Sequence, residues 1–62
     1  MGWVIHYRTG PDFKSADAPS RTAALDLACA LMREGADVLF LQGPRGETIG
    51  RQEIDTYCAR VR

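Results

Sequence analysis

Apolar and polar side chains alternate along residues 3–8, the pattern of a β-strand with one face in the core. The face that we expect to be buried carries the larger apolar side chains, Trp3, Ile5 and Tyr7. The opposite face carries Val4, His6 and Arg8. A turn is predicted at Thr9–Asp12, because Gly10 and Pro11 favour the dihedral angles of a tight reversal. The mostly polar segment Phe13–Ala16 leaves open whether it returns as a short strand.

A helical pattern begins after Ser20, whose hydroxyl is suited to accept a hydrogen bond from the first turn. Apolar residues then recur at positions i, i+3, i+4 and i+7, namely Ala24, Leu27, Ala28 and Leu31. Gly35 suits the left-handed position that ends many helices. The spacing therefore predicts an amphipathic helix that lies close against a sheet.

The run Val38–Leu41 is apolar on both faces of a strand, which is typical of strands covered on two sides. Pro44 and Gly46 then fit a type I turn, and Glu47–Ile49 fits a short return strand. We expect the first helix to cover one face of Val38–Leu41. Another helix or another molecule would have to cover the second face.

A second helix is predicted to begin near Gly50. Its apolar stripe at helical spacing comprises Ile54, Tyr57, Cys58 and Val61. Together the elements predict one α+β domain over residues 1–62, a two-layer sandwich of three or four strands and two helices in β(β)αββα order. If Trp3–Arg8 and Val38–Leu41 lie parallel, their connection should be a right-handed crossover.

Length and charge narrow the possible functions. A chain of 62 residues hides only ~60% of the surface that its unfolded form exposes, so its core is thin and a partner subunit is a common supplement. Eight basic residues balance eight acidic ones, which leaves a net charge of +0. Non-specific nucleic-acid binding requires a positive field, so this balance favours a protein partner.

Candidate catalytic groups are few. His6 has no second histidine to share a metal, and the carboxylates fall at turns and on helix faces that we expect to be solvated. We therefore expect no enzyme activity, no cofactor and no metal site. Cys29 and Cys58 are expected to be structural residues. A disulfide between them is geometrically possible if both helices share one face of the sheet, although a reducing compartment disfavours it.

The candidate binding residues are the strand face Val4, His6 and Arg8, joined by Arg45 from the second turn. Our first hypothesis is that they contact another protein, with a homodimer preferred because the thin core and the two-sided strand Val38–Leu41 both favour a partner. The alternative is a nucleic-acid-binding sheet surface with arginines. Trp3 and Tyr7 argue against that alternative, because they lie on the face expected to be buried and leave no platform for base stacking.

No segment approaches the ~20 apolar residues of a membrane helix, and residues 1–6 lack the pattern of a secretory signal. We therefore expect no membrane association and a cytoplasmic protein.

A set of core and turn residues also carries a resemblance: Trp3–Tyr7, Ala23–Leu25, Ala28-Cys29, Gly43-Pro44, Gly46, Ile49, Ile54 and Tyr57-Cys58. Through these residues the chain resembles short uncharacterised bacterial proteins. The resemblance implies a small bacterial α/β domain, and it brings no known activity to this chain.

Overall fold

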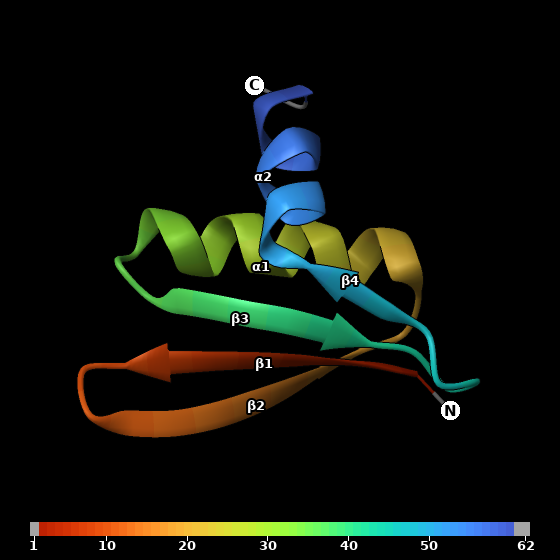
Figure 1. Ribbon diagram of the computed structural model, residues 1–62, viewed down its shortest axis with the longest axis horizontal. Coiled ribbons are helices and arrows are strands. Elements are labelled where there is room, and N and C mark those ends of the chain that lie inside the picture. Colours follow the sequence, from red (N-terminus) through yellow and green to blue (C-terminus); the bar gives the residue numbers. More distant parts are fainter. Residues whose placement is uncertain (1, 61–62) are drawn as a thin grey trace.

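The computed structural model describes residues 2–60 (Figure 1). They form β1 (Trp3–Thr9), β2 (Asp12–Ala18), α1 (Arg21–Arg33), β3 (Asp37–Gln42), β4 (Thr48–Gly50) and α2 (Arg51–Arg60). The sheet order is β2-β1-β3-β4, and every neighbouring pair is antiparallel. The α+β class is confirmed, with four strands in ββαββα order. Because β1 and β3 are antiparallel, the crossover expected for a parallel pair does not arise.

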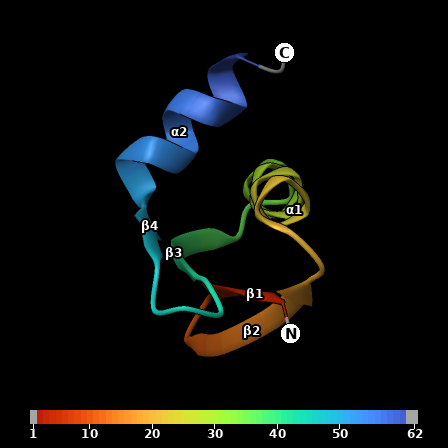
Figure 2. The ribbon, with the colours of Figure 1, turned by 90° about the vertical axis from the view of Figure 1, so that its right-hand side faces the viewer.

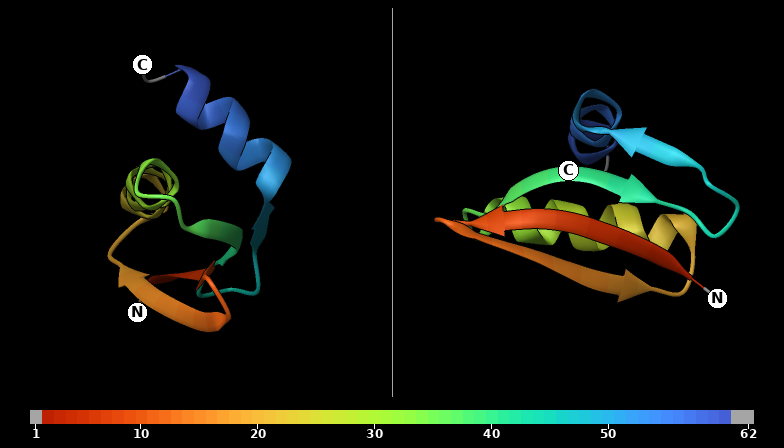
Figure 3. Two further views of the ribbon diagram at one scale, coloured as in Figure 1. Left: turned by 90° about the vertical axis from the view of Figure 1, so that its left-hand side faces the viewer. Right: turned by 60° about the horizontal axis from the view of Figure 1, so that its bottom comes forward.

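Both helices lie on one side of the sheet, which curls around α1 (Figure 2). The helix α1 packs on β1, β2 and β3, and α2 crosses α1 steeply (Figure 1). Within residues 2–60, no element covers the other side of the sheet (Figure 3, left). Neither of these helices combines the length and apolarity that crossing a membrane requires.

The ends of α1 follow the sequence signals. The Oγ of Ser20 accepts a hydrogen bond from the Ala23 amide at 3.2 Å, which satisfies one donor of the first turn. Gly35 adopts a φ of 93°, and the Ala36 amide donates to the Leu31 carbonyl at 3.0 Å. This is the backbone pattern of a Schellman motif, so both predicted helix ends are confirmed.

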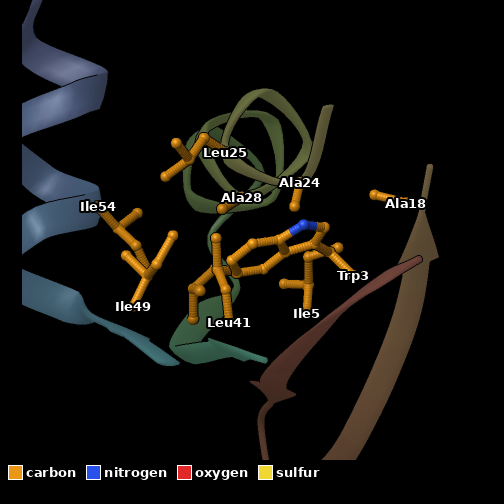
Figure 4. Packing of buried hydrophobic residues seen from close by; sticks show 10 residues of the cluster. Trp3, Ile5, Ala18, Ala24, Leu25, Ala28, Leu41, Ile49 and Ile54 are labelled. Carbon is orange, nitrogen blue, oxygen red and sulfur yellow. The ribbon is translucent and has the colours of Figure 1, made fainter. Parts of the chain in front are cut away.

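The core lies between α1, α2 and the concave side of the sheet. In Figure 4, the Trp3 ring lies against the α1 residues Ala24 and Ala28, whose small side chains let the helix approach the sheet. The buried stripe of α1 includes Leu25 and Cys29, whereas the predicted stripe residue Leu27 is only partly buried. The stripe is rotated because α2 also packs against α1. The buried core residues are Trp3, Ile5, Ala18, Ala24, Leu25, Ala28, Val38, Leu41, Ile49 and Ile54.

The two hairpins have short turns. The β1–β2 turn contains Gly10 with a φ of 60°, and it leads into a β2 that is longer than the segment considered from the sequence. In the β3–β4 turn, the Gly46 amide donates to the Gly43 carbonyl at 3.3 Å, as in the predicted type I turn. Gly43 is buried, and a Cβ there would lie 3.0 Å from ring atoms of Trp3.

A β-bulge in β3 explains why its apolar run has only one covered face. Tyr7 pairs with Val38 and His6 pairs with Phe40, so one extra residue, Leu39, interrupts the register. The bulge lets both Val38 and Leu41 enter the core although they are three positions apart. Leu39 and Phe40 are exposed, at 36% and 37% of their surface. Within residues 2–60 no second helix covers the other face of Val38–Leu41, so of the two predicted covers only another molecule stays a prediction.

A disulfide joins Cys29 of α1 to Cys58 of α2, with 5.6 Å between their Cα atoms. The geometric condition for this bond, two helices on one face of the sheet, is met. The structure therefore contains the bond that the sequence left open, and the expectation that a reducing compartment disfavours it depends on the location of the protein. In α2 itself Ile54 is buried, whereas Tyr57 and Cys58 are partly buried; the predicted stripe residue Val61 lies outside the described residues.

Candidate interaction surface

The side of the sheet that α1 and α2 leave uncovered is called here the open face. The sheet register assigns to it Val4, His6 and Arg8 of β1, Phe13, Ser15 and Asp17 of β2, and Asp37, Phe40 and Gln42 of β3, with the bulged Leu39 beside them. Three large apolar side chains are exposed within residues 2–60, and all three lie in these strands: Phe13 at 73%, Leu39 and Phe40. The exposed apolar surface of the described chain is thus concentrated on one side of the sheet.

An aromatic pair occupies the middle of the open face. The rings of His6 on β1 and Phe40 on β3 are stacked, with centroids 4.5 Å apart and planes 21° from parallel. The Nε2 atom of His6 lies 3.1 Å from Oε1 of Gln42, which follows Phe40 by two positions in β3. Stacking and hydrogen bonding together orient the imidazole over the sheet.

A chain of ion pairs borders one end of the open face. Arg8 contacts Asp37 at 3.1 Å, Asp37 contacts Arg51 at 2.9 Å, and Arg51 contacts Asp55 at 3.1 Å. Arg51 also donates to the Val38 carbonyl at 3.3 Å. The hydrogen bond to Asp55 is the largest of several effects that raise the pKa of Arg51. These exposed pairs are individually weak, but they neutralise the end of the face at which Arg8 lies.

Three of the four predicted binding residues lie together on the open face, and the fourth does not join them. Val4, His6 and Arg8 follow one another along the uncovered side of β1. Arg45 lies in the β3–β4 turn, where its backbone amide donates to Oε1 of Glu47 at 2.8 Å. Among the described contacts, none joins the Arg45 side chain to the other three. Arg45 is therefore not part of the surface defined here.

The sequence interpretation missed the exposed aromatic residues. Phe40 was assigned to a doubly covered strand, and Phe13 to a segment of uncertain structure. The bulge at Leu39 exposes Phe40, and pairing with Arg8 on β1 places Phe13 on the same side. The argument that no aromatic platform exists is therefore wrong, since His6, Phe40 and Phe13 supply aromatic rings to the open face.

A half-open hollow of about 170 Å³ lies between the helices and is lined by Arg21, Leu25, Glu53, Thr56, Tyr57 and Arg60. Arg21 contacts Glu53 at 2.9 Å, and the Tyr57 hydroxyl donates to Asp26 at 2.8 Å. The Asp26 hydrogen bond, reinforced by partial desolvation, raises the pKa of Tyr57. These contacts fasten α2 to α1. Within residues 2–60, no group of three or more metal-ligating side chains is assembled.

Comparison with protein-family models, curated proteins and solved structures found no match to this chain. The resemblance to short bacterial proteins therefore stays a prediction.

Proposed function

We propose that this chain is a non-enzymatic protein-interaction module that self-associates through the open face. The observation that carries the proposal is the concentration of exposed apolar side chains on the side of the sheet that no described element covers. Several large apolar side chains exposed on one uncovered sheet face are typical of interaction sites. A chain of 62 residues also has a thin core, which gains from burial against a partner.

The charge of the open face fits a partner of similar composition. Arg8 is compensated by Asp37, and the whole chain has a net charge of +0. A second copy therefore meets no net repulsion, and the face offers no excess charge to attract a strongly charged partner.

Sedimentation velocity on the oxidised protein at increasing concentration tests self-association. We expect a monomer–dimer equilibrium. The substitution Phe40→Asp should shift it towards monomer, because it puts a charge where the open face would be buried in the dimer. The matched control is Gln52→Asp, which adds the same charge to exposed α2 and should leave association unchanged. A wild type that stays monomeric at millimolar concentration would refute the proposal, as would a Phe40→Asp variant that associates normally.

Single-stranded nucleic acid is the second candidate ligand, and the aromatic residues of the open face favour it. Bases stack on exposed rings such as Phe40 and Phe13. The neutral charge and the Arg8–Asp37 pair oppose it, because phosphate binding requires available cations. Amide chemical shifts recorded during titration with short single-stranded DNA and RNA decide the matter. Salt-sensitive shifts at the open face would support this candidate, and their absence would remove it.

The cytoplasmic location is also a proposal, and the disulfide between Cys29 and Cys58 opposes it. Cytosolic reductants keep most cysteine pairs reduced. A cytoplasmic protein should therefore contain Cys29 and Cys58 as free thiols in the cell. Rapid acid quenching followed by thiol alkylation would detect two modified cysteines in that case. An unmodified, disulfide-bonded protein would contradict the cytoplasmic location.

A further inference from the structure

The open face is built from cross-strand rows whose two members differ in chemistry. Arg8 on β1 lies beside Asp37 on β3, a cation beside an anion. The next row places the imidazole of His6 beside the phenyl ring of Phe40. These two rows thus offer on one strand a group that can pair with its neighbour on the other strand, and the third row places Val4 beside Gln42. A surface of this kind is complementary to itself when it is turned about the line between the two strands.

We infer that the partner is a second copy related by a two-fold axis that lies between β1 and β3 and runs parallel to them. This inference rests on the proposed function, because it specifies how the open face would self-associate. The axis places β1 of one copy across from β3 of the other. Arg8 then faces Asp37 of the second copy, and His6 faces Phe40 of the second copy. Each copy contributes the same surface, as a closed dimer requires.

A two-fold axis perpendicular to the strands gives a poorer match. Such an axis would place β1 of one copy across from β1 of the other, and β3 across from β3, with the facing strands running in opposite directions. If that axis passes through the His6–Phe40 row, Arg8 of one copy faces Val4 of the other, and Asp37 faces Gln42. Both charges would lose water without gaining an opposite charge across the interface, which is costly. Charge complementarity therefore favours the parallel axis.

Two oppositely charged variants test this arrangement. Arg8→Asp gives the end of the open face two acidic residues, and Asp37→Arg gives it two basic residues. With the parallel axis, like charges meet in each homodimer, so each variant alone should dissociate at least about ten-fold more readily than the wild type. An equimolar mixture places acidic residues opposite basic ones. The mixture should therefore form a 1:1 heterodimer with an affinity close to that of the wild type.

The outcomes separate the inference from the proposed function. A wild type that never associates would refute both. A wild type that associates, with a mixture as weak as the separate variants, would refute only the parallel axis.

Asp37 also contacts Arg51, so the fold of each variant is checked first by its amide spectrum. The wild type offers a second measurement, namely nuclear Overhauser effects between isotope-labelled and unlabelled copies. The parallel axis requires contacts from the Val4 methyl groups to Gln42 of the other copy. Contacts from Val4 to Arg8 of the other copy would overturn it.

Discussion

The same two central strands present their apolar side chains to very different surroundings on their two faces. Towards the helices, Ile5 of β1 and Leu41 of β3 have 0% of their surface exposed. On the open face, their neighbours His6 and Phe40 stack on each other, and Phe40 remains 37% exposed. The helices α1 and α2 cover one face, and a disulfide joins them. Stability should therefore depend on the covered face, and association on the open face.

Adjacent substitutions in β3 test this division with the largest expected effect. Leu41→Ala removes a fully buried side chain and should lower the free energy of unfolding by about 2–5 kcal/mol. Phe40→Ala removes a partly exposed ring and should cost about 1 kcal/mol or less in the monomer. Urea denaturation at a concentration at which sedimentation velocity detects only monomer measures both. Equal losses from the two substitutions would show that both faces are buried to a similar degree.

The disulfide between the two covering helices should make the next largest contribution to the free energy of unfolding. Cys29 and Cys58 are 29 positions apart, and closing a loop of that length should stabilise the fold by about 3–4 kcal/mol. Reduction should lower the urea midpoint and loosen α2 first, because a helix of 10 residues is marginal without its tertiary contacts. Amide hydrogen exchange in α2 with and without dithiothreitol measures this loosening.

The variant with both Cys29→Ser and Cys58→Ser is the control for that experiment. It should match the reduced wild type and should not respond to dithiothreitol. If the oxidised and reduced proteins unfold at the same urea concentration, the disulfide does not stabilise the covered face.

Local signals predicted much of this fold because they act within a few residues. Ser20, Gly35 and Gly46 specify caps and turns through their own dihedral angles and hydrogen bonds. The bulge at Leu39 has no such local signal, since Val38–Leu41 is compatible with a regular strand. Its position depends on which side chains the helices bury. The disulfide likewise depends on how α1 and α2 pack.

The candidate surface was predicted only in part for the same reason. Alternation in β1 identified Val4, His6 and Arg8 correctly as a separate face. Phe40 and Phe13 join that face through the pairing of β1 with its neighbours, which is a tertiary property. Arg45 was grouped with the surface by residue type, and residue type alone does not place a turn next to a strand face.

The core on the covered face extends to the β3–β4 turn, where we expect a substitution to have a smaller effect on the free energy of unfolding. A Cβ at Gly43 would lie 2.7 Å from Oε1 of the exposed Glu47, which can move, and 3.0 Å from ring atoms of Trp3, whose ring is packed in the core. Gly43→Ala should therefore cost about 1–3 kcal/mol through overpacking. At Gly50, a Cβ would meet no atom within 4 Å, so Gly50→Ala should change stability by only about 0.5 kcal/mol or less. Thermal unfolding of both variants measures the difference, and a neutral Gly43→Ala would show that Trp3 can move away.

The smallest effect on stability is expected at the exposed contact between α1 and α2, where Tyr57 donates a hydrogen bond to Asp26. This bond favours the neutral phenol and raises the pKa of Tyr57 above its ordinary value of about 10. The hydrogen bond therefore stabilises the fold below about pH 10, and its contribution is lost as the pH rises through the raised pKa. Ultraviolet titration in a Tyr7→Phe background reports Tyr57 separately.

Adding Asp26→Ala to that background should return the pKa of Tyr57 towards its ordinary value. Its effect on stability should be small, because an exposed hydrogen bond exchanges readily with water. An unchanged titration on removal of Asp26 would show that this hydrogen bond does not form in solution. The attachment of α2 to α1 would then depend on Ile54, the disulfide and the exposed Arg21–Glu53 pair, so that most of its stability comes from the buried interior.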